Sequence, residues 1–242
     1  MKILALDSSG LVASVAVMED DTLTAEFSIQ YKKTHSQTLL PMMDEIKGMI
    51  DLELASLDAV AVSAGPGSFT GLRIGSATAK GLGLALDIPL IEVPTLEGLA
   101  YNLYGCNGYI CPIMDARRGQ VYTGVYEFIK EGRPDGYIMR TVKEQSALSI
   151  EGIAKILNDL GKEVIFLGDG APVFRDRLPE LMKTAYSFAP AHMNRQRAAS
   201  VASLAGVYYK EGKTVPAAEH VPVYLRMSQA ERERGEKEAG KR

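Results

Sequence analysis

The sequence predicts an α/β protein of two similar lobes, each with a mixed sheet flanked by helices. Two observations predict this fold. Apolar runs of strand length alternate with helical patterns along most of the 242 residues. The order of elements in residues 1–105 then recurs, more loosely, in residues 106–228. Duplicated β-β-β-α-β-α halves are typical of the actin-like architecture (ASKHA, RNase H-like), in which the cleft between the lobes is the natural ligand site.

The first half opens with three strands. An apolar run over residues 2–6 ends at Asp7, and strands at residues 13–18 and 23–29 follow it. The short turn between the first two indicates a hairpin. From residue 36 the apolar period becomes that of an amphipathic helix. The apolar face of this helix consists of Leu39, Met43, Ile46 and Ile50, with Met42 and Met49 beside them.

A glycine-rich turn joins a buried strand at residues 58–64 to a helix at residues 70–86. Gly65 and Gly67 permit positive φ and close backbone approach, and Pro66 stiffens the turn. The amides at such a helix start attract anions. No Gly-Lys-Ser/Thr follows, so the P-loop interpretation fails. A purely structural turn is the alternative interpretation.

Small residues recur every four positions along this helix, at Gly71, Gly75, Ala79 and Gly83. A glycine costs about 1 kcal/mol relative to alanine inside a helix, so this stripe indicates close contact with another backbone. Two interpretations stay open. The stripe packs on the chain's own sheet, or it forms a helix–helix interface with a second subunit.

The rest of the chain continues the same alternation. A strand at residues 90–93 and a helix at residues 95–103 complete the first half. The second half predicts strands at residues 110–114, 121–128, 137–142 and 163–167, a short helix from residue 171 or 172, and longer helices at residues 150–160 and 198–210. The last residues, 229–242, are charged and nearly devoid of apolar side chains, so we expect a disordered tail.

Composition limits the classes of function. The net charge of −3 excludes a globally basic surface for nucleic acid but leaves a local basic patch open. Cys106 and Cys111 match no zinc or redox spacing, and free thiols fit a reducing cytosol. We find no signal peptide and no apolar run of membrane-spanning length, so we expect a cytoplasmic protein that contacts no membrane.

The candidate ligand residues lie at the predicted cleft. Asp7 and Asp115 end the first strand of each half, where aspartates of actin-like phosphotransferases orient magnesium or water. The loop that follows Asp7, with Ser8 and Ser9, has one glycine and makes a thin phosphate cradle. Arg117 and Arg118 could bind a phosphate or a carboxylate. Strand-end carboxylates satisfied by turn amides, and an exposed arginine turn, are the structural alternatives.

Three segments resemble the bacterial TsaB (YeaZ) family, within the glycoprotease-like superfamily that includes TsaD. They are residues 3–9 (ILALDSS), residues 34–41 (THSQ leading to LP) and residues 65–75 (GPGSFTGLRIG), of which the last is the most specific. The resemblance is strong over residues 1–105 and looser beyond. It implies an accessory subunit that binds and activates TsaD, with TsaE joining them, to form N6-threonylcarbamoyladenosine at position 37 of tRNAs reading ANN codons.

The resemblance also implies that catalysis lies elsewhere. The catalytic relative binds its metal through a His-Met-Glu-Gly-His segment, and residues 95–99 here read TLEGL. Thr95 and Leu99 cannot replace imidazoles on iron or zinc. We therefore expect no catalytic or metal-binding residue and no cofactor in this chain. ATP binding by the complex cannot be assigned to it, and tRNA would be met through the complex.

The first-half helices are the expected partner-binding surface. Adaptable methionines suit an interface, and the same surface could form a homodimer. The predicted partner-binding residues are Leu39, Met42, Met43, Ile46, Gly71, Gly75, Ala79 and Gly83. A stand-alone actin-fold kinase or ATPase is the alternative function, with Asp7, Asp115 and the turn at residues 168–170 in its cleft. A stand-alone metallopeptidase is disfavoured by the missing histidine pair.

Overall fold

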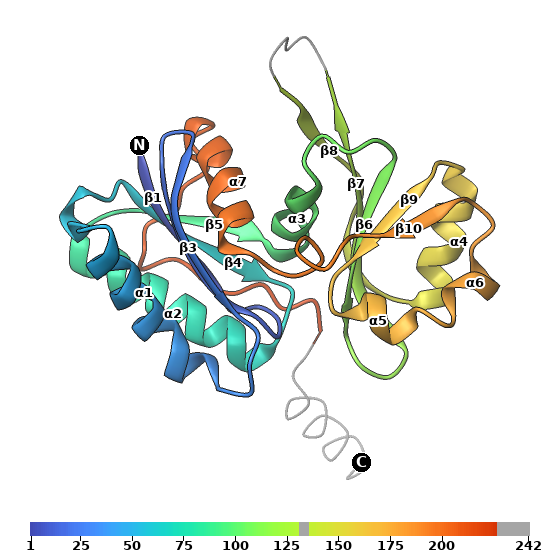
Figure 1. The fold of residues 1–242 in the computed structure, drawn as a ribbon, viewed down its shortest axis with the longest axis horizontal. Helices are drawn as coiled ribbons and strands as arrows, with labels where there is room; N and C mark the ends of the chain where they lie inside the picture. The colour runs from blue at the N-terminus through green and yellow to red at the C-terminus, as the bar shows by residue number, and fades with distance from the viewer. Residues whose placement is uncertain (131–135, 227–242) are drawn as a thin grey trace, which may run out of the picture.

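The structure, a computed structural model, describes residues 1–130 and 136–226 of the chain. Two five-stranded mixed sheets stand side by side, each flanked by helices (Figure 1). This is the duplicated actin-like fold that the sequence predicts. The charged tail expected at residues 229–242 lies outside the described residues. Among the described residues, no helix combines the length and the apolar composition that a bilayer crossing needs.

The first sheet has the strand order β3-β2-β1-β4-β5. Its strands are β1 (Lys2–Asp7), β2 (Ala13–Glu19), β3 (Thr22–Ile29), β4 (Ala59–Gly65) and β5 (Leu90–Pro94). The predicted hairpin is confirmed, because β1 pairs antiparallel with β2, while β4 lies parallel on its other side. The helices α1 (His35–Met49) and α2 (Phe69–Leu86) cover one face of this sheet (Figure 1). A short 3-10 turn, Leu54–Ser56, precedes β4.

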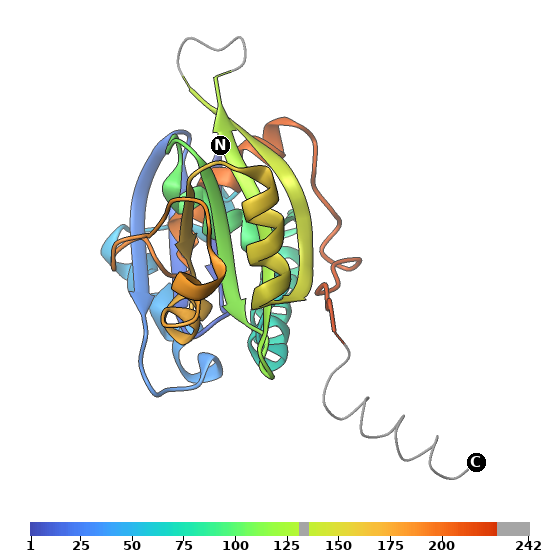
Figure 2. The ribbon, with the colours of Figure 1, turned by 90° about the vertical axis from the view of Figure 1, so that its right-hand side faces the viewer.

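The second sheet repeats this plan with the order β10-β9-β6-β7-β8. Its strands are β6 (Tyr109–Asp115), β7 (Gln120–Ile129), β8 (Ile138–Ser149), β9 (Val164–Leu167) and β10 (Tyr186–Phe188). One face packs on α4 (Ile150–Leu160), α5 (Gly170–Phe174) and α6 (Leu178–Leu181), and Figure 2 shows α4 lying against the strands. The other face packs on α3 (Thr95–Ala100) and the 3-10 turn after it (Tyr101–Leu103).

Helix α7 (Ala198–Lys210) lies on the first sheet, opposite α1 and α2 (Figure 1). The sequence division placed this helix in the second lobe, at residues 106–228. The reason for the difference is the first sheet itself, whose strands are apolar on both faces, while α1 and α2 cover only one. Val201 and Ala202 bury the second face by packing with Ile3 and Ala5. The two lobes are therefore not two continuous halves of the chain.

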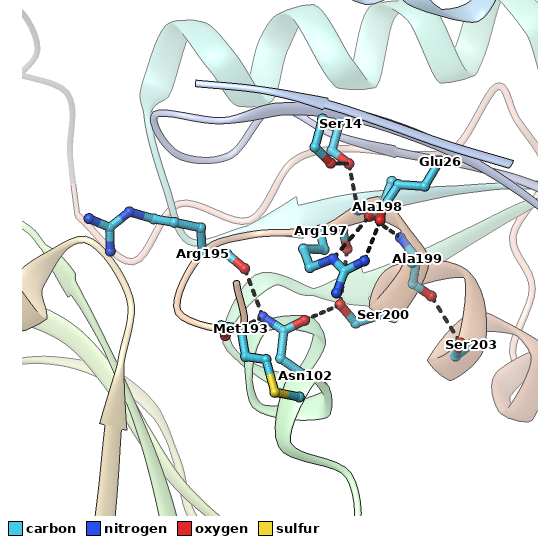
Figure 3. A network of polar contacts seen from close by, with 11 residues as sticks. Ser14, Glu26, Asn102, Met193, Arg195, Arg197, Ala198, Ala199, Ser200 and Ser203 are labelled. Carbon is cyan, nitrogen blue, oxygen red and sulfur yellow. Dashed lines mark hydrogen bonds and ion pairs between the residues drawn. The ribbon is translucent and has the colours of Figure 1, made fainter. Parts of the chain in front are cut away.

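The start of α7 is capped by side chains from the first sheet (Figure 3). The Ser14 hydroxyl on β2 accepts a hydrogen bond from the backbone N–H of Ala198 at 2.8 Å. The Glu26 carboxylate on β3 accepts from the N–H of Ala199 at 3.2 Å and pairs with the guanidinium of Arg197. These bonds satisfy amides that a helix start leaves without an intrahelical partner, and so they fix the direction in which α7 crosses the sheet.

Asn102 ties together the two chain segments that cross between the lobes (Figure 3). It follows α3, close to where the chain enters the second lobe. Its side-chain amide donates to the carbonyl oxygens of Met193 at 2.9 Å and Arg195 at 2.7 Å, on the segment that returns to α7. Its carbonyl oxygen accepts from the hydroxyl of Ser200. One buried amide thus joins both crossings to the first turn of α7.

The small-residue stripe of α2 is buried in its own lobe. A Cβ on Gly71 would collide with the carbonyl oxygen of Ser8, and one on Gly75 would lie 2.5 Å from the Ser8 hydroxyl. A Cβ on Gly83 would lie 2.7 Å from the Cβ of Ala217, and Ala79 is fully buried. The open choice between self-packing and a second subunit is therefore decided for these four positions in favour of self-packing.

The predicted apolar face of α1 is likewise part of the core. Leu39, Met42 and Ile46 are buried among the strands of the first sheet, and Met43 packs against the same cluster. The sequence-based assignment of these side chains to a partner is therefore corrected. The apolar face of an amphipathic helix usually packs on the sheet of its own domain. The helical period locates that face in the sequence, but it does not show whether the face packs in the core or binds a partner.

Two glycines of α2 give a direct test of this packing. Gly71→Ala should destabilise the chain by about 1–3 kcal/mol, because its methyl group would meet the Ser8 carbonyl oxygen. Gly81→Ala should stabilise it by about 0.5–1 kcal/mol, because a Cβ at Gly81 meets open space and alanine favours helix. Urea unfolding of both variants and the parent measures the difference. Equal effects from the two substitutions would contradict the packing.

Candidate functional site

A cleft between the lobes encloses a cavity of about 540 Å³. The first lobe contributes the loop between β1 and β2, the start of α2 and the loop before α1. The second lobe contributes the turn between β6 and β7, and the C-terminal segment at residues 224–226 closes one side. Of the predicted ligand residues, Ser9, Asp115 and Arg117 line this cavity, whereas Asp7 and Ser8 do not.

The carboxylate of Asp7 accepts hydrogen bonds from other residues of the chain and does not face the cleft. Its carboxylate accepts from the backbone N–H of Ser9 at 2.9 Å, from the Ser9 hydroxyl at 2.7 Å and from the Ser63 hydroxyl at 2.6 Å. Burial raises the pKa of Asp7, and these hydrogen bonds oppose that rise. The Ser8 hydroxyl donates to the Gly71 carbonyl oxygen at 2.8 Å. The prediction that Asp7 and Ser8 face a cleft ligand is therefore corrected.

The start of α2 fills the space beside this loop. The backbone N–H of Ser68 donates to the Ser9 carbonyl oxygen at 2.7 Å. A Cβ on Gly67 would collide with that same carbonyl oxygen, so only glycine allows this approach. From α1, the Nε2 of His35 lies 2.9 Å from the Gly10 carbonyl oxygen and donates to it. The loop after β1 is thus braced by two helix starts.

The two carboxylates of the second lobe are also engaged. Asp169 accepts a hydrogen bond from the backbone N–H of Asp115 at 3.1 Å. Asp115 accepts from the N–H of Arg117 at 2.8 Å, and the Arg117 guanidinium lies 3.6 Å from its second carboxylate oxygen. Burial raises the pKa of Asp169. In the described parts of the chain no group of three His, Cys, Asp or Glu side chains could hold a metal ion.

The turn between β6 and β7 holds two arginines in the left-handed region. Arg117 has φ +65° and Arg118 has φ +56°, and Gly119 follows at +71°. The N–H of Gln120 closes the turn on the Arg117 carbonyl oxygen at 3.1 Å. A residue with a Cβ costs on the order of 1 kcal/mol or more in this region, and only glycine, asparagine or aspartate visit it readily. The turn therefore carries strain at the edge of the cleft.

The C-terminal segment crosses the glycine-rich turn and reaches the second lobe. The N–H of Val223 donates to the Ala64 carbonyl oxygen at 2.7 Å. The ring of Tyr224 packs on Phe69, with centroids 4.9 Å apart. The Arg226 guanidinium then donates to the Ala116 carbonyl oxygen at 2.6 Å. Upstream in the same segment, buried His220 binds Glu92 and Ser76.

Sequence reasoning missed most of the residues that line the cleft. They come from separate parts of the chain and share no spacing: Tyr31, Lys33, Phe69, Tyr122, Tyr224 and Arg226. Arg118, predicted together with Arg117 as a binder of phosphate or carboxylate, also lines the cleft. The contribution of the C-terminal segment depends on tertiary structure alone.

Comparisons with known proteins assign the chain to a family. Residues 23–234 match the family described as TsaD, tRNA N6-adenosine threonylcarbamoyltransferase. A Bacillus subtilis protein named tRNA threonylcarbamoyladenosine biosynthesis protein TsaB is 34% identical over 231 residues, which are 96% of each chain. YeaZ from Pseudomonas aeruginosa has 30% sequence identity and a TM-score of 0.78, with 93% of this chain and 99% of that chain covered. The chain belongs to the TsaB (YeaZ) family.

Other members agree with this assignment over nearly their whole length. The TsaB protein of Escherichia coli is 32% identical over 231 residues, which are 93% of this chain and 95% of that protein. A second Pseudomonas aeruginosa structure, described as an uncharacterized protein with similarity to peptidase YEAZ, has a TM-score of 0.79 and 30% identity, with 93% of this chain and 99% of that chain covered. The TsaB-family resemblance inferred from the motifs is confirmed.

In this TsaB-family chain, the segment compared above with a metal site is built into the core. The Thr95 hydroxyl accepts from the backbone N–H of Gly65 at 3.1 Å, which ties α3 to the glycine-rich turn. Leu99 is buried in the core on the α3 side of the second sheet. Glu97 accepts a hydrogen bond from the Tyr208 hydroxyl on α7, and burial raises the pKa of Glu97. Each of the three side chains has an intramolecular role.

The partly buried carboxyl of Asp169 should make stability depend on pH. Because its pKa is raised in the folded chain, the folded state keeps the proton over a pH range in which the unfolded state has lost it. This contribution to the free energy of unfolding therefore falls as the pH rises from about 4 through the folded pKa. Asp169→Asn should remove the contribution and flatten the curve, measured by urea unfolding at several pH values. An unchanged slope would contradict this assignment.

Proposed function

We propose that this chain is a non-catalytic accessory subunit in the formation of N6-threonylcarbamoyladenosine at position 37 of tRNAs reading ANN codons. In this proposal it binds and activates TsaD, and TsaE joins the pair. Membership in the TsaB family and the names of the curated relatives support the pathway. The outer face of α1 and α2 supports the partnership, and it is the observation on which the proposal chiefly depends.

That outer face presents large apolar side chains to solvent. Leu40 on α1 is 51% exposed, and Leu84 on α2 is 60% exposed. Both helices begin at the cleft, since His35 contacts Gly10 and the N–H of Ser68 contacts Ser9. They therefore run in the same direction, and they lie side by side on the outside of the first lobe (Figure 1). A partner helix laid along them would cover both apolar side chains.

Glycines on the same face support close approach by a partner. A Cβ at Gly48 on α1 or at Gly81 on α2 would meet nothing within 4 Å. Each costs about 1 kcal/mol relative to alanine, and no contact among the described residues compensates for it. Ala77 and Ala85 are exposed one turn before and one turn after Gly81. This second stripe, at residues 77–85, replaces the buried one as the proposed contact.

The same outer face could serve two different assemblies. When TsaD is absent, a second copy of this chain could occupy the face as a symmetric homodimer. To activate TsaD, the chain must bind the active conformation of that enzyme more tightly than the inactive one. Catalysis by this chain is disfavoured, because Asp7 and Asp169 are held by internal hydrogen bonds and Thr95 and Leu99 occupy the positions of the absent histidines.

Leu84→Asp and Leu40→Asp should each weaken binding to TsaD at least tenfold, because each would bury an unpaired carboxylate in the interface. Titration calorimetry with purified TsaD measures the dissociation constant. Val173→Asp is the matched control, since Val173 is 56% exposed on α5 of the second lobe. All three variants should keep the parent's unfolding midpoint. Unchanged affinity in both first-lobe variants would refute the proposed interface.

Purified chain without TsaD should transfer no threonylcarbamoyl group to tRNA, and addition of TsaD and TsaE should restore the reaction. The reason is that buried Asp7 and the cleft residue Asp115 already accept structural hydrogen bonds. The measurement is threonylcarbamoyladenosine in digested tRNA by mass spectrometry, with a TsaD-only reaction as the reference. Metal-stimulated transfer by the chain alone would overturn the non-catalytic assignment. ATP turnover by the chain alone would favour a kinase or ATPase.

A further inference from the structure

We propose that the cleft between the lobes binds a single-stranded segment of RNA. The inference rests on the proposed function in one respect, namely that RNA is the substrate of the reaction in which the chain takes part. The binding itself is a property of the cleft and needs no other subunit. It would give the accessory subunit a direct role in holding the substrate.

Cations dominate the side chains that face the cleft. Among the described residues that line it, Lys33, Arg117, Arg118 and Arg226 are basic, and only Asp115 and Asp169 are acidic. Both acids already accept hydrogen bonds from backbone N–H groups. The chain as a whole carries a net charge of −3, so this concentration of positive charge is local. A local basic patch on an acidic protein is the electrostatic footprint of an anionic ligand.

Most of these cations are free to bind an anion. In the described parts of the chain, neither Lys33 nor Arg118 forms an ion pair, and both are exposed. The Arg117 side chain is 85% exposed, and its Nη1 lies 3.6 Å from one carboxylate oxygen of Asp115. The other guanidinium nitrogens of Arg117 remain available to a ligand. Arg226 donates to the Ala116 carbonyl oxygen through one nitrogen. Guanidinium groups of this kind bind phosphate in bidentate fashion.

Aromatic rings stand among the cations. Tyr31 is 72% exposed and Tyr224 is 38% exposed, and both line the cavity together with Phe69 and Tyr122. An exposed tyrosine ring provides a face on which an unpaired base can stack, whatever the base. Phosphate-binding cations interleaved with stacking platforms are the combination by which proteins hold single-stranded nucleic acid.

The strained turn also points to the arginine side chains. Arg117 and Arg118 both adopt positive φ, where glycine or asparagine would fold with less strain. No hydrogen bond or ion pair among the described residues uses the Arg118 guanidinium. Its side chain therefore contributes nothing to folding that would offset the strain. A ligand in the cleft supplies the reason for an arginine at this position.

The arrangement favours an extended ligand over a compact nucleotide. The cations come from the loop before α1, from the turn between β6 and β7 and from the C-terminal segment, so they lie on several sides of the opening. A compact polyphosphate would instead use the loop after β1, which the glycines of α2 and the ring of His35 brace at close range. A chain of phosphodiesters with splayed bases matches spread cations and separate rings.

The test is fluorescence anisotropy of a labelled tRNA anticodon stem-loop with the full-length chain, at salt concentrations between about 50 and 200 mM. For a single strand, each phosphate neutralised by a protein cation contributes about 0.7 to the slope of log K against log salt. Arg118→Gly and Lys33→Gln should each reduce the slope by about that amount. Tyr31→Ala should weaken binding about fivefold or more with the slope unchanged.

Two controls separate the cleft from general charge and from misfolding. Lys183→Gln removes an exposed cation that is not among the cleft residues, and its slope should equal the parent's. Arg118→Gly should raise the unfolding midpoint, because glycine relieves the positive φ, even as RNA binding weakens. A variant that is more stable and binds less tightly cannot be explained by loss of fold.

Defined outcomes would overturn the inference. One is that Arg118→Gly and Lys33→Gln both have the same slope of log K against log salt as the parent. Another is displacement of the RNA by micromolar ATP with no dependence on RNA length, which would make the cleft a site for a small nucleotide. Failure of TsaD binding is separate, since it is measured on Leu84→Asp and Leu40→Asp. RNA binding that survives those two substitutions supports the cleft even if the proposed interface is wrong.

Discussion

The packing of the loop after β1 against the start of α2 is the constraint on which the rest of the structure depends. Gly67 and Gly71 place their Cα atoms directly against the carbonyl oxygens of Ser9 and Ser8, an approach that no residue with a Cβ allows. This approach sets the position of α2, and α2 then buries Ala79 and Gly83 as it crosses the sheet. It also places the loop after β1 and the start of α2 side by side on the first-lobe wall of the cleft.

Sequence patterns predicted the duplicated α/β fold because each strand and helix carries a local period of apolar residues. They predicted the joint at residues 65–75 for the same local reason. Sequence patterns could not show which part of the protein the small residues of α2 contact. Four-residue spacing of small residues indicates close approach to another backbone, but it does not identify that backbone. The carboxylate of Asp7 was expected in the cleft, yet it accepts a hydrogen bond from Ser63, a residue 56 positions away. The cleft side chains of Tyr31 and Tyr224 lie on loops that meet only in three dimensions.

The first lobe separates its two candidate surfaces along the same pair of helices. Their N-terminal turns face the cleft, where cations and rings from both lobes converge around Lys33 and Arg118. Their outer faces carry the exposed apolar side chains Leu40 and Leu84. A protein bound along the outer face would therefore leave the cleft open. Binding of a partner and binding of a polyanion are compatible in this geometry.

The packing of α7 on the first sheet has a consequence for the order in which the molecule is made. Ile3 and Ala5 leave the ribosome roughly 200 residues before Val201 and Ala202, the α7 side chains that pack against them. At usual elongation rates of roughly 5–20 residues per second, that face of the first sheet stays exposed on the order of ten seconds or more before α7 is synthesised and buries it. The first lobe can therefore finish folding only after the second sheet has been synthesised. Until then its exposed apolar face is a natural substrate for chaperones.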